Sequence, residues 1–122
     1  MFIILSICGD SMHPTLKDGE YYLAMRIFHT STFSFPAVRV RKVYAVKLPQ
    51  SCINEHEWVI KRLMHIDCHG TFDSGFYTNI YSAFIEGDNK NNSYDSRDFG
   101  NIPIECLKYQ LLFKVWGGKK ND

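Results

Sequence analysis

Apolar and polar side chains alternate along five segments of the chain, and this period of two predicts β-strands. The predicted strands cover residues 20–25, 42–48, 57–66, 76–86 and 109–116. Helical periodicity is weak, and only residues 11–17 are predicted to form a short helix, with Pro14 tolerated in its first turn. The pattern therefore predicts a mostly β fold, a coiled antiparallel β-sheet with few short helices.

Two segments lack this alternation and are predicted as loops. Residues 27–40 mix aromatic side chains with Ser, Thr and Pro, and Phe28, Phe33 and Phe35 belong either to the core or to an exposed apolar lip. Residues 87–100 are rich in Asn, Asp and Ser, which favour turns. On composition alone, this second segment is best interpreted as a solvated hairpin loop.

The composition fits one compact domain, because the chain has 122 residues and 45% of them are hydrophobic. The net charge is +1, and the Lys and Arg residues are scattered along the chain. Nucleic-acid binding needs a basic patch, so we expect no nucleic-acid partner. We interpret residues 1–122 as a single domain.

The cysteines and a short histidine-containing segment were considered as metal or disulfide sites. Cys8, Cys52, Cys68 and Cys106 form no C-x-x-C pair, which argues against a zinc ribbon or a thioredoxin-like site. Their even number is compatible with two disulfides or with free thiols. Residues 65–69 hold two His, one Asp and one Cys, but a strand or turn cannot point four ligands at one ion. We therefore expect no metal and no cofactor.

The N-terminal apolar run, residues 2–8, is the only candidate for membrane insertion. It is far shorter than the roughly 20 residues that a membrane-spanning helix needs. No basic region precedes it, which is unlike a secretory signal peptide. We expect no transmembrane segment in this chain.

Ser11 lies in the segment GDSMHPTL, a tight turn near the N-terminus. Such a serine is usually a cap or a turn residue. It is also a candidate nucleophile, since its backbone N–H and that of its neighbour can face a developing oxyanion. A serine hydroxyl attacks only when a base takes its proton, so a nucleophilic role requires a base elsewhere in the chain.

Lys61, in the segment VIKRL, is the candidate base. On a strand it shares a face with Val59 and Leu63, and burial on that face disfavours the charged ammonium. A base near neutral pH needs a pKa lowered by roughly 2–3 units, at a cost of about 3–4 kcal/mol. The alternative is an ordinary lysine whose stem packs on the surface while its ammonium reaches water.

Three segments together resemble one protease family. GDSMHPTL, VIKRL and GDNKNNSYDSRDFGNIP occur in the order and at roughly the spacing seen in type I signal peptidases, and the resemblance covers about residues 7–103. The first segment is also similar to self-cleaving repressors of the LexA type, whereas the third is much more specific. The resemblance implies a coiled antiparallel β-sheet domain of the signal peptidase/LexA-like protease type.

The resemblance assigns catalytic roles to three residues of this sequence. It implies that Ser11 is the nucleophile, that Lys61 is the general base, and that Ser93 hydrogen-bonds and orients the lysine. A neutral lysine needs such support, because it reaches the serine only from a fixed rotamer. Residues 87–100, which composition alone describes as a solvated loop, are therefore interpreted as the segment that supports Lys61.

The same loop contains the charged residues that would hold it rigid. The resemblance matches Asp95 and Arg97 to the family's structural ion pair, and Asp88 is expected to join them as a second carboxylate partner. An ion pair within the loop would fix the position of Ser93.

The resemblance also implies a binding site for an extended peptide, which is added as a strand beside the catalytic residues. The residues expected to contribute are Ile7, Gly9, Met12, Leu16 and Ile60. Gly9 stands where some members have a serine that donates to the oxyanion, so backbone N–H groups must serve here. On a flat strand Ile60 and Lys61 point to opposite faces, so both reach one site only if the strand twists or Ile60 acts through its backbone.

The function implied is a serine endopeptidase that removes signal peptides, with small residues before the cut, from exported preproteins. The family acts at a membrane surface with its active site on the extracytoplasmic side. We expect residues 1–122 to be the catalytic domain, with the N-terminal membrane anchor of many members absent or truncated.

Three alternatives remain open. The first is a specialised processing peptidase of a conjugation or pilus system, which the sequence does not separate from a signal peptidase. The second is a catalytically silent relative that binds apolar peptides. The third is a self-cleaving LexA-like regulator, which is disfavoured because it needs a scissile segment upstream and only ten residues precede Ser11.

Overall fold

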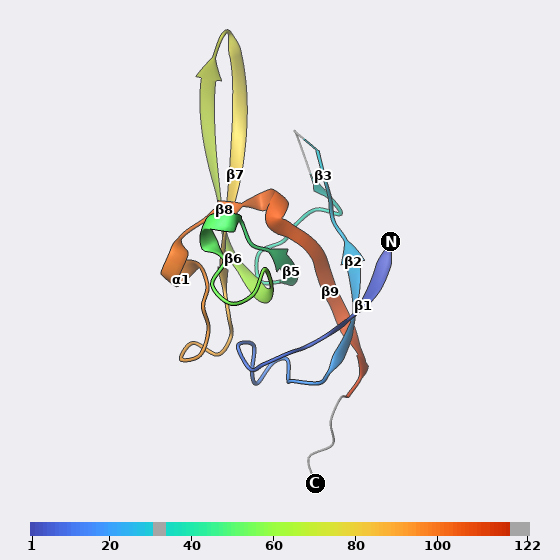
Figure 1. Ribbon diagram of the computed structural model, residues 1–122. Helices are drawn as coiled ribbons and strands as arrows, with labels where there is room; N and C mark the ends of the chain where they lie inside the picture. Colours follow the sequence, from blue (N-terminus) through green and yellow to red (C-terminus); the bar gives the residue numbers. More distant parts are fainter. Residues whose placement is uncertain (31–33, 118–122) are drawn as a thin grey trace.

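The computed structural model of the protein describes residues 1–30 and 34–117 (Figure 1). Its main feature is a seven-stranded antiparallel sheet with the strand order β1-β2-β9-β5-β6-β7-β8, and β3 and β4 form a separate small hairpin. The strands are β1 (Phe2–Ser6), β2 (Tyr21–Arg26), β3 (Phe28–His29), β4 (Ser34–Phe35), β5 (Val43–Lys47), β6 (Trp58–Asp73), β7 (Phe76–Glu86), β8 (Ile102–Pro103) and β9 (Leu107–Trp116). The helical elements are α1 (Ser96–Phe99) and two 3₁₀ turns, Gln50–Cys52 and Ile104–Cys106. The predicted mostly β, antiparallel fold class is confirmed.

All five predicted strands are present, with shifted ends. β7 has the predicted bounds, β5 lies within its predicted segment, and β2 and β9 are displaced at one or both ends by one or two residues. β6 begins one residue later than predicted and continues to Asp73. β1 was not predicted as a strand, and it pairs with β2 along its whole length.

The helix predicted for residues 11–17 is wrong, because this segment forms a series of turns. The Leu16 N–H donates to the Met12 carbonyl at 3.0 Å, which is a single helical turn. The Ser11 carbonyl instead accepts from the Asn89 N–H at 2.9 Å, so it is used by a distant loop. Conversely, α1 lies in the predicted loop, where Asp95 and Asp98 form a capping box at its start.

Two clusters of buried apolar side chains lie on the two faces of the sheet, and β5 contributes to both. Tyr44 and Val46 face the larger cluster, whereas Ala45 between them faces the smaller one. The smaller cluster contains Ile7, Met12 and Leu16 of the turn segment. This packing ties the segment around Ser11 to the sheet without making it a strand of the sheet.

β6 and β7 continue beyond the sheet as a two-stranded ribbon that projects from the body (Figure 1). Its outer part is solvent-exposed on both faces. The Tyr77 side chain crosses Gly70 so closely that a Cβ there would lie 1.9 Å from the Tyr77 hydroxyl. A side chain at position 70 would therefore have to displace the exposed Tyr77 ring.

Several open questions from the sequence are answered by the fold. All four cysteines are free thiols, and Cys52 is buried. Phe28 and Phe35 are exposed, as an apolar lip would be, whereas Phe33 lies outside the described residues. Within residues 1–30 and 34–117, no helix has the length and apolar character needed to cross a membrane.

Candidate active site

Ser11 lies on the turn segment between β1 and β2, and its side chain is half-buried. Gly9 opens this turn with a φ of 82°, a conformation that favours glycine. The Gly9 N–H donates to the Asp18 carboxylate at 2.8 Å, so this group is already used. In the described part of the chain the Ser11 N–H has no acceptor, and it remains available to a bound group.

Lys61 lies on β6 opposite Tyr44 of β5, and it is only 3% exposed. Burial lowers the pKa of its amine, the charge of Asp95 opposes this effect, and the charge of Arg97 adds to it. Among the residues that the structure describes, the amine has no carboxylate within ion-pair distance and no hydrogen-bond partner. Its surroundings therefore favour the neutral amine over the ammonium.

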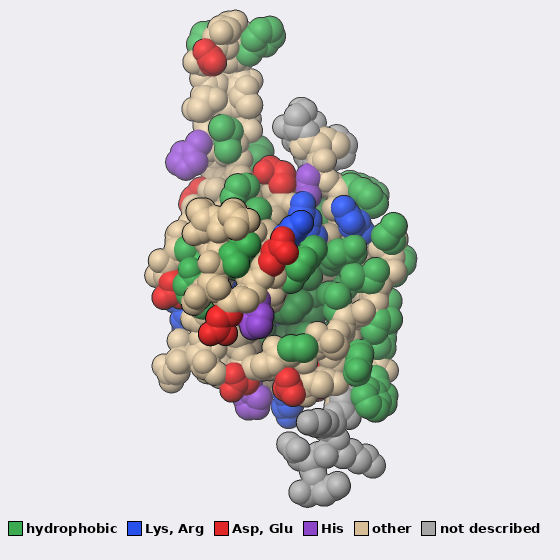
Figure 2. Space-filling model, viewed as in Figure 1, with side chains coloured by type: hydrophobic (Ala, Val, Ile, Leu, Met, Phe, Trp, Pro, Cys, Tyr) green, Lys and Arg blue, Asp and Glu red, His purple; other side chains and the backbone are tan. Residues whose placement is uncertain are grey.

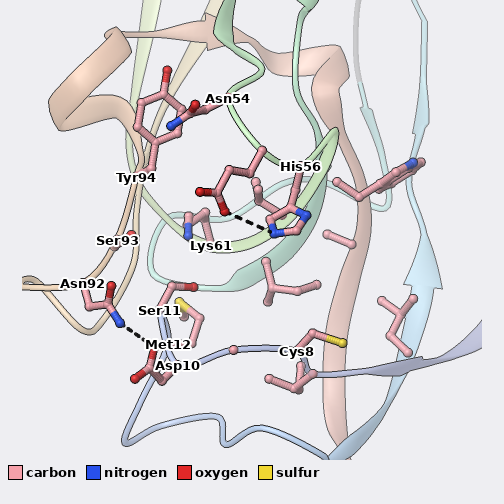
Figure 3. A pocket seen from close by; sticks show the side chains of 18 of the residues that line it. Cys8, Asp10, Ser11, Met12, Asn54, His56, Lys61, Asn92, Ser93 and Tyr94 are labelled. Carbon is pink, nitrogen blue, oxygen red and sulfur yellow. Dashed lines mark hydrogen bonds and ion pairs between the residues drawn. The ribbon is translucent and has the colours of Figure 1, made fainter.

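Ser11 and Lys61 line one cleft of about 880 Å³. Figure 3 shows their side chains pointing toward each other, although they come from the turn after β1 and from β6. Ser93 lies beside Lys61 in the same view and lines the same cleft. The structure thus brings together the three residues that the sequence assigned to catalysis.

Asp95 is the centre of the loop that carries Ser93, and its carboxylate is fully buried. It accepts five hydrogen bonds, from the Gly87 N–H, the Ser93 hydroxyl, and the N–H, Nε and Nη2 groups of Arg97. Burial by itself raises the pKa of Asp95, but the hydrogen bonds from Arg97, Gly87 and Ser93 outweigh it and lower the pKa to about 2. The predicted Asp95–Arg97 pair is present, with 2.7 Å between Arg97 Nη2 and Asp95 Oδ2.

Ser93 makes a different hydrogen bond from the one expected. Its hydroxyl donates to Asp95 Oδ2 at 2.7 Å, and no hydrogen bond joins it to Lys61 in the described residues. A hydroxyl oxygen that donates its proton to a carboxylate still has lone pairs that can accept from an amine. The geometry therefore leaves Ser93 able to accept from Lys61 while Asp95 fixes its rotor.

The expected second partner of Arg97 is wrong. Asp88 pairs with Arg62 through two hydrogen bonds, 2.9 Å from Nε and 2.7 Å from Nη2, and Glu86 is the more distant second carboxylate at 3.9 Å from Arg97. The register of the sheet explains why Asp88 pairs with Arg62. Arg62 lies opposite Glu86, the last residue of β7, and Asp88 follows two residues later. Asp88 thus ties the loop to the residue that follows Lys61.

Contacts between the Ser11 turn and the loop after β7 were not foreseen from the sequence. The Asn89 N–H donates to the Ser11 carbonyl at 2.9 Å, and Asn89 Nδ2 donates to the Asp10 carbonyl at 3.0 Å. Asn92 Nδ2 donates to the Asp10 carboxylate. A Cβ on Gly87 would lie 2.2 Å from the Ser93 hydroxyl and 2.6 Å from the Ser11 carbonyl oxygen.

The expected substrate-binding residues divide into two groups. Ile7, Met12 and Ile60 line the cleft together with Gly9. Leu16 is buried in the smaller core cluster and is not among the residues that line the cleft. Leu16 packs beneath the turn because its backbone closes the single helical turn on Met12.

Ile60 and Lys61 both reach the cleft because it lies along the edge of β6. β5 pairs with residues 58–62 of β6 on one side, whereas β7 joins the other side only from Arg62 onward. Among the described residues, the edge of β6 before Arg62 is therefore unpaired on that side, and both Ile60 and Lys61 line the cleft there. The apparent conflict between the two side chains does not arise.

The cleft has further walls that sequence reasoning missed. They are formed by Asn54 and His56 from the segment before β6, by Trp58 at the start of β6, and by Tyr94, which follows Ser93. No local pattern marks these residues. They line the site because the chain turns there toward Lys61.

The segment 65–69 is a surface feature. His65 Nε2 is 2.8 Å from Asp67 Oδ1, and Asn101 Nδ2 donates to the other carboxylate oxygen of Asp67. In the part of the chain that the structure describes, no three His, Cys, Asp or Glu side chains converge as metal ligands would.

The amino-acid sequence is similar to those of several known proteins. No family model matches the chain. Human mitochondrial inner membrane protease subunit 1 is 40% identical over 121 residues, which cover 93% of this chain and 69% of the relative. The mouse protein of the same name is 24% identical over the same shares. The Arabidopsis thaliana mitochondrial ATP-independent inner membrane protease subunit 1b is 28% identical, over 88% of this chain and 66% of its own length.

Proposed function

This chain belongs to the type I signal peptidase family that includes mitochondrial inner membrane protease subunit 1, and from that premise we propose a serine endopeptidase with a Ser11–Lys61 dyad. Its family is one of proteases that process exported proteins. The finer proposal is that it removes signal peptides with small residues before the cut. Residues 1–122 would form the catalytic domain, since one sheet contains both β1 and β9.

The observation that carries this proposal is the environment of Lys61. An ordinary lysine keeps its ammonium in water, but this one is 3% exposed and opens onto the cleft that Ser11 lines. Burial lowers its pKa, and no carboxylate among the described residues pairs with it. Those conditions are costly for an ammonium and suited to a base.

The chemistry uses these two groups in alternation. Neutral Lys61 takes the proton of the Ser11 hydroxyl as its oxygen attacks the carbonyl carbon of the scissile peptide bond. The Ser11 N–H stabilises the oxyanion of the tetrahedral intermediate. The Lys61 ammonium then gives its proton to the leaving amine, which departs and leaves an acyl ester on Ser11. Lys61 next takes a proton from water, whose hydroxide attacks the ester, and returns that proton to Ser11.

Ser93 and Asp95 support this cycle without contacting the substrate. Ser93 accepts a hydrogen bond from Lys61 and so sets the rotamer of its amine. Asp95 holds the Ser93 hydroxyl proton, which keeps the oxygen lone pairs directed at the amine. Arg97 and Gly87 fix Asp95 in turn.

The substrate peptide would bind as an additional strand. β1 is the edge strand of the sheet, and the edge of β6 before Arg62 is unpaired among the described residues. Residues 5–8 and 58–61 both line the cleft, so an extended peptide in it could hydrogen-bond to either segment. Ile7 and Met12 line the cleft and are themselves buried, so we propose that they contact the small residues before the cut.

We further propose that the protein works at a membrane surface, with its active site on the extracytoplasmic side. The relatives named above are inner membrane proteases. Figure 2 shows apolar side chains gathered over β1, β2 and β9. By register these include Phe2, Ile4, Phe113 and Trp116, all more than half exposed. A solvated apolar surface of this extent is typical of an interaction site.

Vesicle sedimentation tests the membrane proposal. Phosphatidylcholine vesicles should bind the wild-type protein, and Phe113→Asp should weaken that binding because it places a charge in the apolar face. Phe72→Asp is the control, because Phe72 is even more exposed than Phe113 (74% against 56%) but lies on the ribbon. Equal binding by wild type and Phe113→Asp would contradict the assignment of this face.

Peptide cleavage tests the dyad. The substrate is a peptide that carries an apolar segment followed by small residues, and the measurement is kcat/KM with the cut mapped by mass spectrometry. Ser11→Ala and Lys61→Ala should each lower the rate by at least about 10²-fold. Lys42→Ala, a change at an exposed lysine, is the control. Full activity of Lys61→Ala would refute the dyad, and tight peptide binding without turnover by wild type would favour a silent relative.

A further inference from the structure

We propose that Asp10 and Asn92 are positioning residues, whose hydrogen bond sets the place of Ser11 relative to Lys61. This inference rests on the proposed dyad and adds to it residues that the sequence did not single out. Asn92 Nδ2 donates to Asp10 Oδ1, across the boundary between the turn that carries Ser11 and the loop that carries Ser93 (Figure 3).

The two catalytic residues are held in different ways. Lys61 belongs to β6, where hydrogen bonds to β5 fix its backbone opposite Tyr44. Ser11 belongs to no strand of the described sheet. Its distance from the Lys61 amine is therefore not set by strand pairing, and contacts from another segment must set it.

Those contacts come from the loop after β7. The Asn89 N–H donates to the Ser11 carbonyl at 2.9 Å, and Asn89 Nδ2 donates to the Asp10 carbonyl at 3.0 Å. Asn92 adds the bond to the Asp10 side chain. The loop thus holds both Asp10 and the backbone carbonyl of Ser11, and this restricts the movement of the Ser11 hydroxyl.

The loop is a rigid reference for this purpose. Asn92 directly precedes Ser93, whose hydroxyl donates to the buried Asp95, and Asp95 also accepts from the Gly87 N–H at the other end of the loop. One loop therefore contacts the turn that carries Ser11 through Asn89 and Asn92, and its Ser93 lines the same cleft as Lys61. The bond from Asn92 to a carboxylate is charge-assisted, so it is stronger than a neutral one.

Removing this bond should impair catalysis more than stability. Asp10 and Asn92 are exposed, and an exposed hydrogen bond contributes little to folding. A nucleophile displaced by a fraction of an ångström, however, loses rate steeply. We expect kcat to fall about tenfold in Asp10→Ala and in Asn92→Ala, with KM changed by less than about twofold.

The experiment measures kcat, KM, their pH profile and the melting temperature for the wild type and five variants. These are Asp10→Ala, Asn92→Ala, the double variant, Asp10→Asn and Lys90→Ala. The double variant should be no slower than either single one, since both break the same bond. Asp10→Asn keeps an oxygen acceptor and should recover most of kcat. Lys90→Ala, at an exposed position of the same loop, should match wild type.

Each other outcome overturns the inference in a recognisable way. Wild-type kcat in both single alanine variants shows that the bond does not position Ser11. If the acidic limb of the profile of kcat against pH shifts in Asp10→Asn, then Asp10 acts through its charge on Lys61. Additive losses in the double variant show two independent roles. A wild-type protein without turnover, or an active Lys61→Ala, refutes the proposed dyad and this inference with it.

Discussion

Replacing Asp95 by Asn tests the electrostatic centre of the site, because the change removes one charge and keeps the shape of the side chain. The Asp95 carboxylate is fully buried and accepts five hydrogen bonds, three of them from Arg97. An amide at this position has one oxygen acceptor instead of two. The variant therefore leaves donors of Arg97, Ser93 or Gly87 without a charged partner.

The magnitude follows from the pKa of Asp95, which is about 2 in the folded protein against an ordinary value of 3.8. A difference of nearly two units corresponds to about 2 kcal/mol of folding free energy. Because the folded-state pKa is the lower one, this contribution is complete above pH 3.8. It is lost as the pH falls from there through about 2, where the folded-state carboxylate also takes up its proton.

Urea unfolding followed by tryptophan fluorescence, at constant ionic strength from pH 7 to pH 2, measures this contribution. At pH 7, Asp95→Asn should have a free energy of unfolding at least about 2 kcal/mol below that of wild type. The difference should shrink by a similar amount as the pH falls through the window between 3.8 and 2. Asp73→Asn, at the exposed tip of the ribbon, is the control. A variant whose stability falls with pH as steeply as that of wild type would refute this account of Asp95.

Three further changes test the packing and charge of the site. Gly87→Ala places a Cβ 2.2 Å from the Ser93 hydroxyl, so kcat/KM should fall about 10²-fold, whereas Gly117→Ala, with no atom within 4 Å, should leave it unchanged. Because burial lowers the pKa of Lys61, a plot of log kcat/KM against pH should level off at a pKa below 10.5; a limb at or above that value means a solvated lysine. Leu63→Ala, at a fully buried position, should lower the free energy of unfolding by about 2–5 kcal/mol in a guanidinium titration, and a loss under about 1 kcal/mol would mean that the core refills the cavity.

The sequence predicted strands where apolar and polar side chains alternate, and it failed where they do not. β7 was bounded correctly, since its inner half alternates between buried and half-buried positions. β1 was missed because Phe2 to Leu5 are all apolar, so no period of two is visible. The outer part of β6, after Ile66, was missed for the opposite reason, since solvent covers both faces of the ribbon.

The site shows a similar division between local and tertiary information. Ser11, Lys61 and Ser93 were placed by short motifs, and the structure brings them to one cleft. The partner of Asp88 was not predictable in this way, because it depends on the register between β6 and β7. The capping box of α1, by contrast, is present in the sequence as Asp95 followed three residues later by Asp98. It was not predicted because the surrounding composition is typical of a loop.

The charges around Lys61 explain how the pKa of this buried lysine is lowered although Asp95 lies near enough to raise it. A free carboxylate in this position would pair with the amine and raise its pKa, and the charge of Asp95 does act in that direction. The hydrogen-bonding capacity of Asp95 is instead taken up by Arg97, Ser93 and Gly87, and the positive charge of Arg97 opposes the effect of Asp95 on the amine. Arg97 thus has two effects: it keeps Asp95 ionised and fixed beside Ser93, and its positive charge opposes the rise that Asp95 causes in the pKa of Lys61.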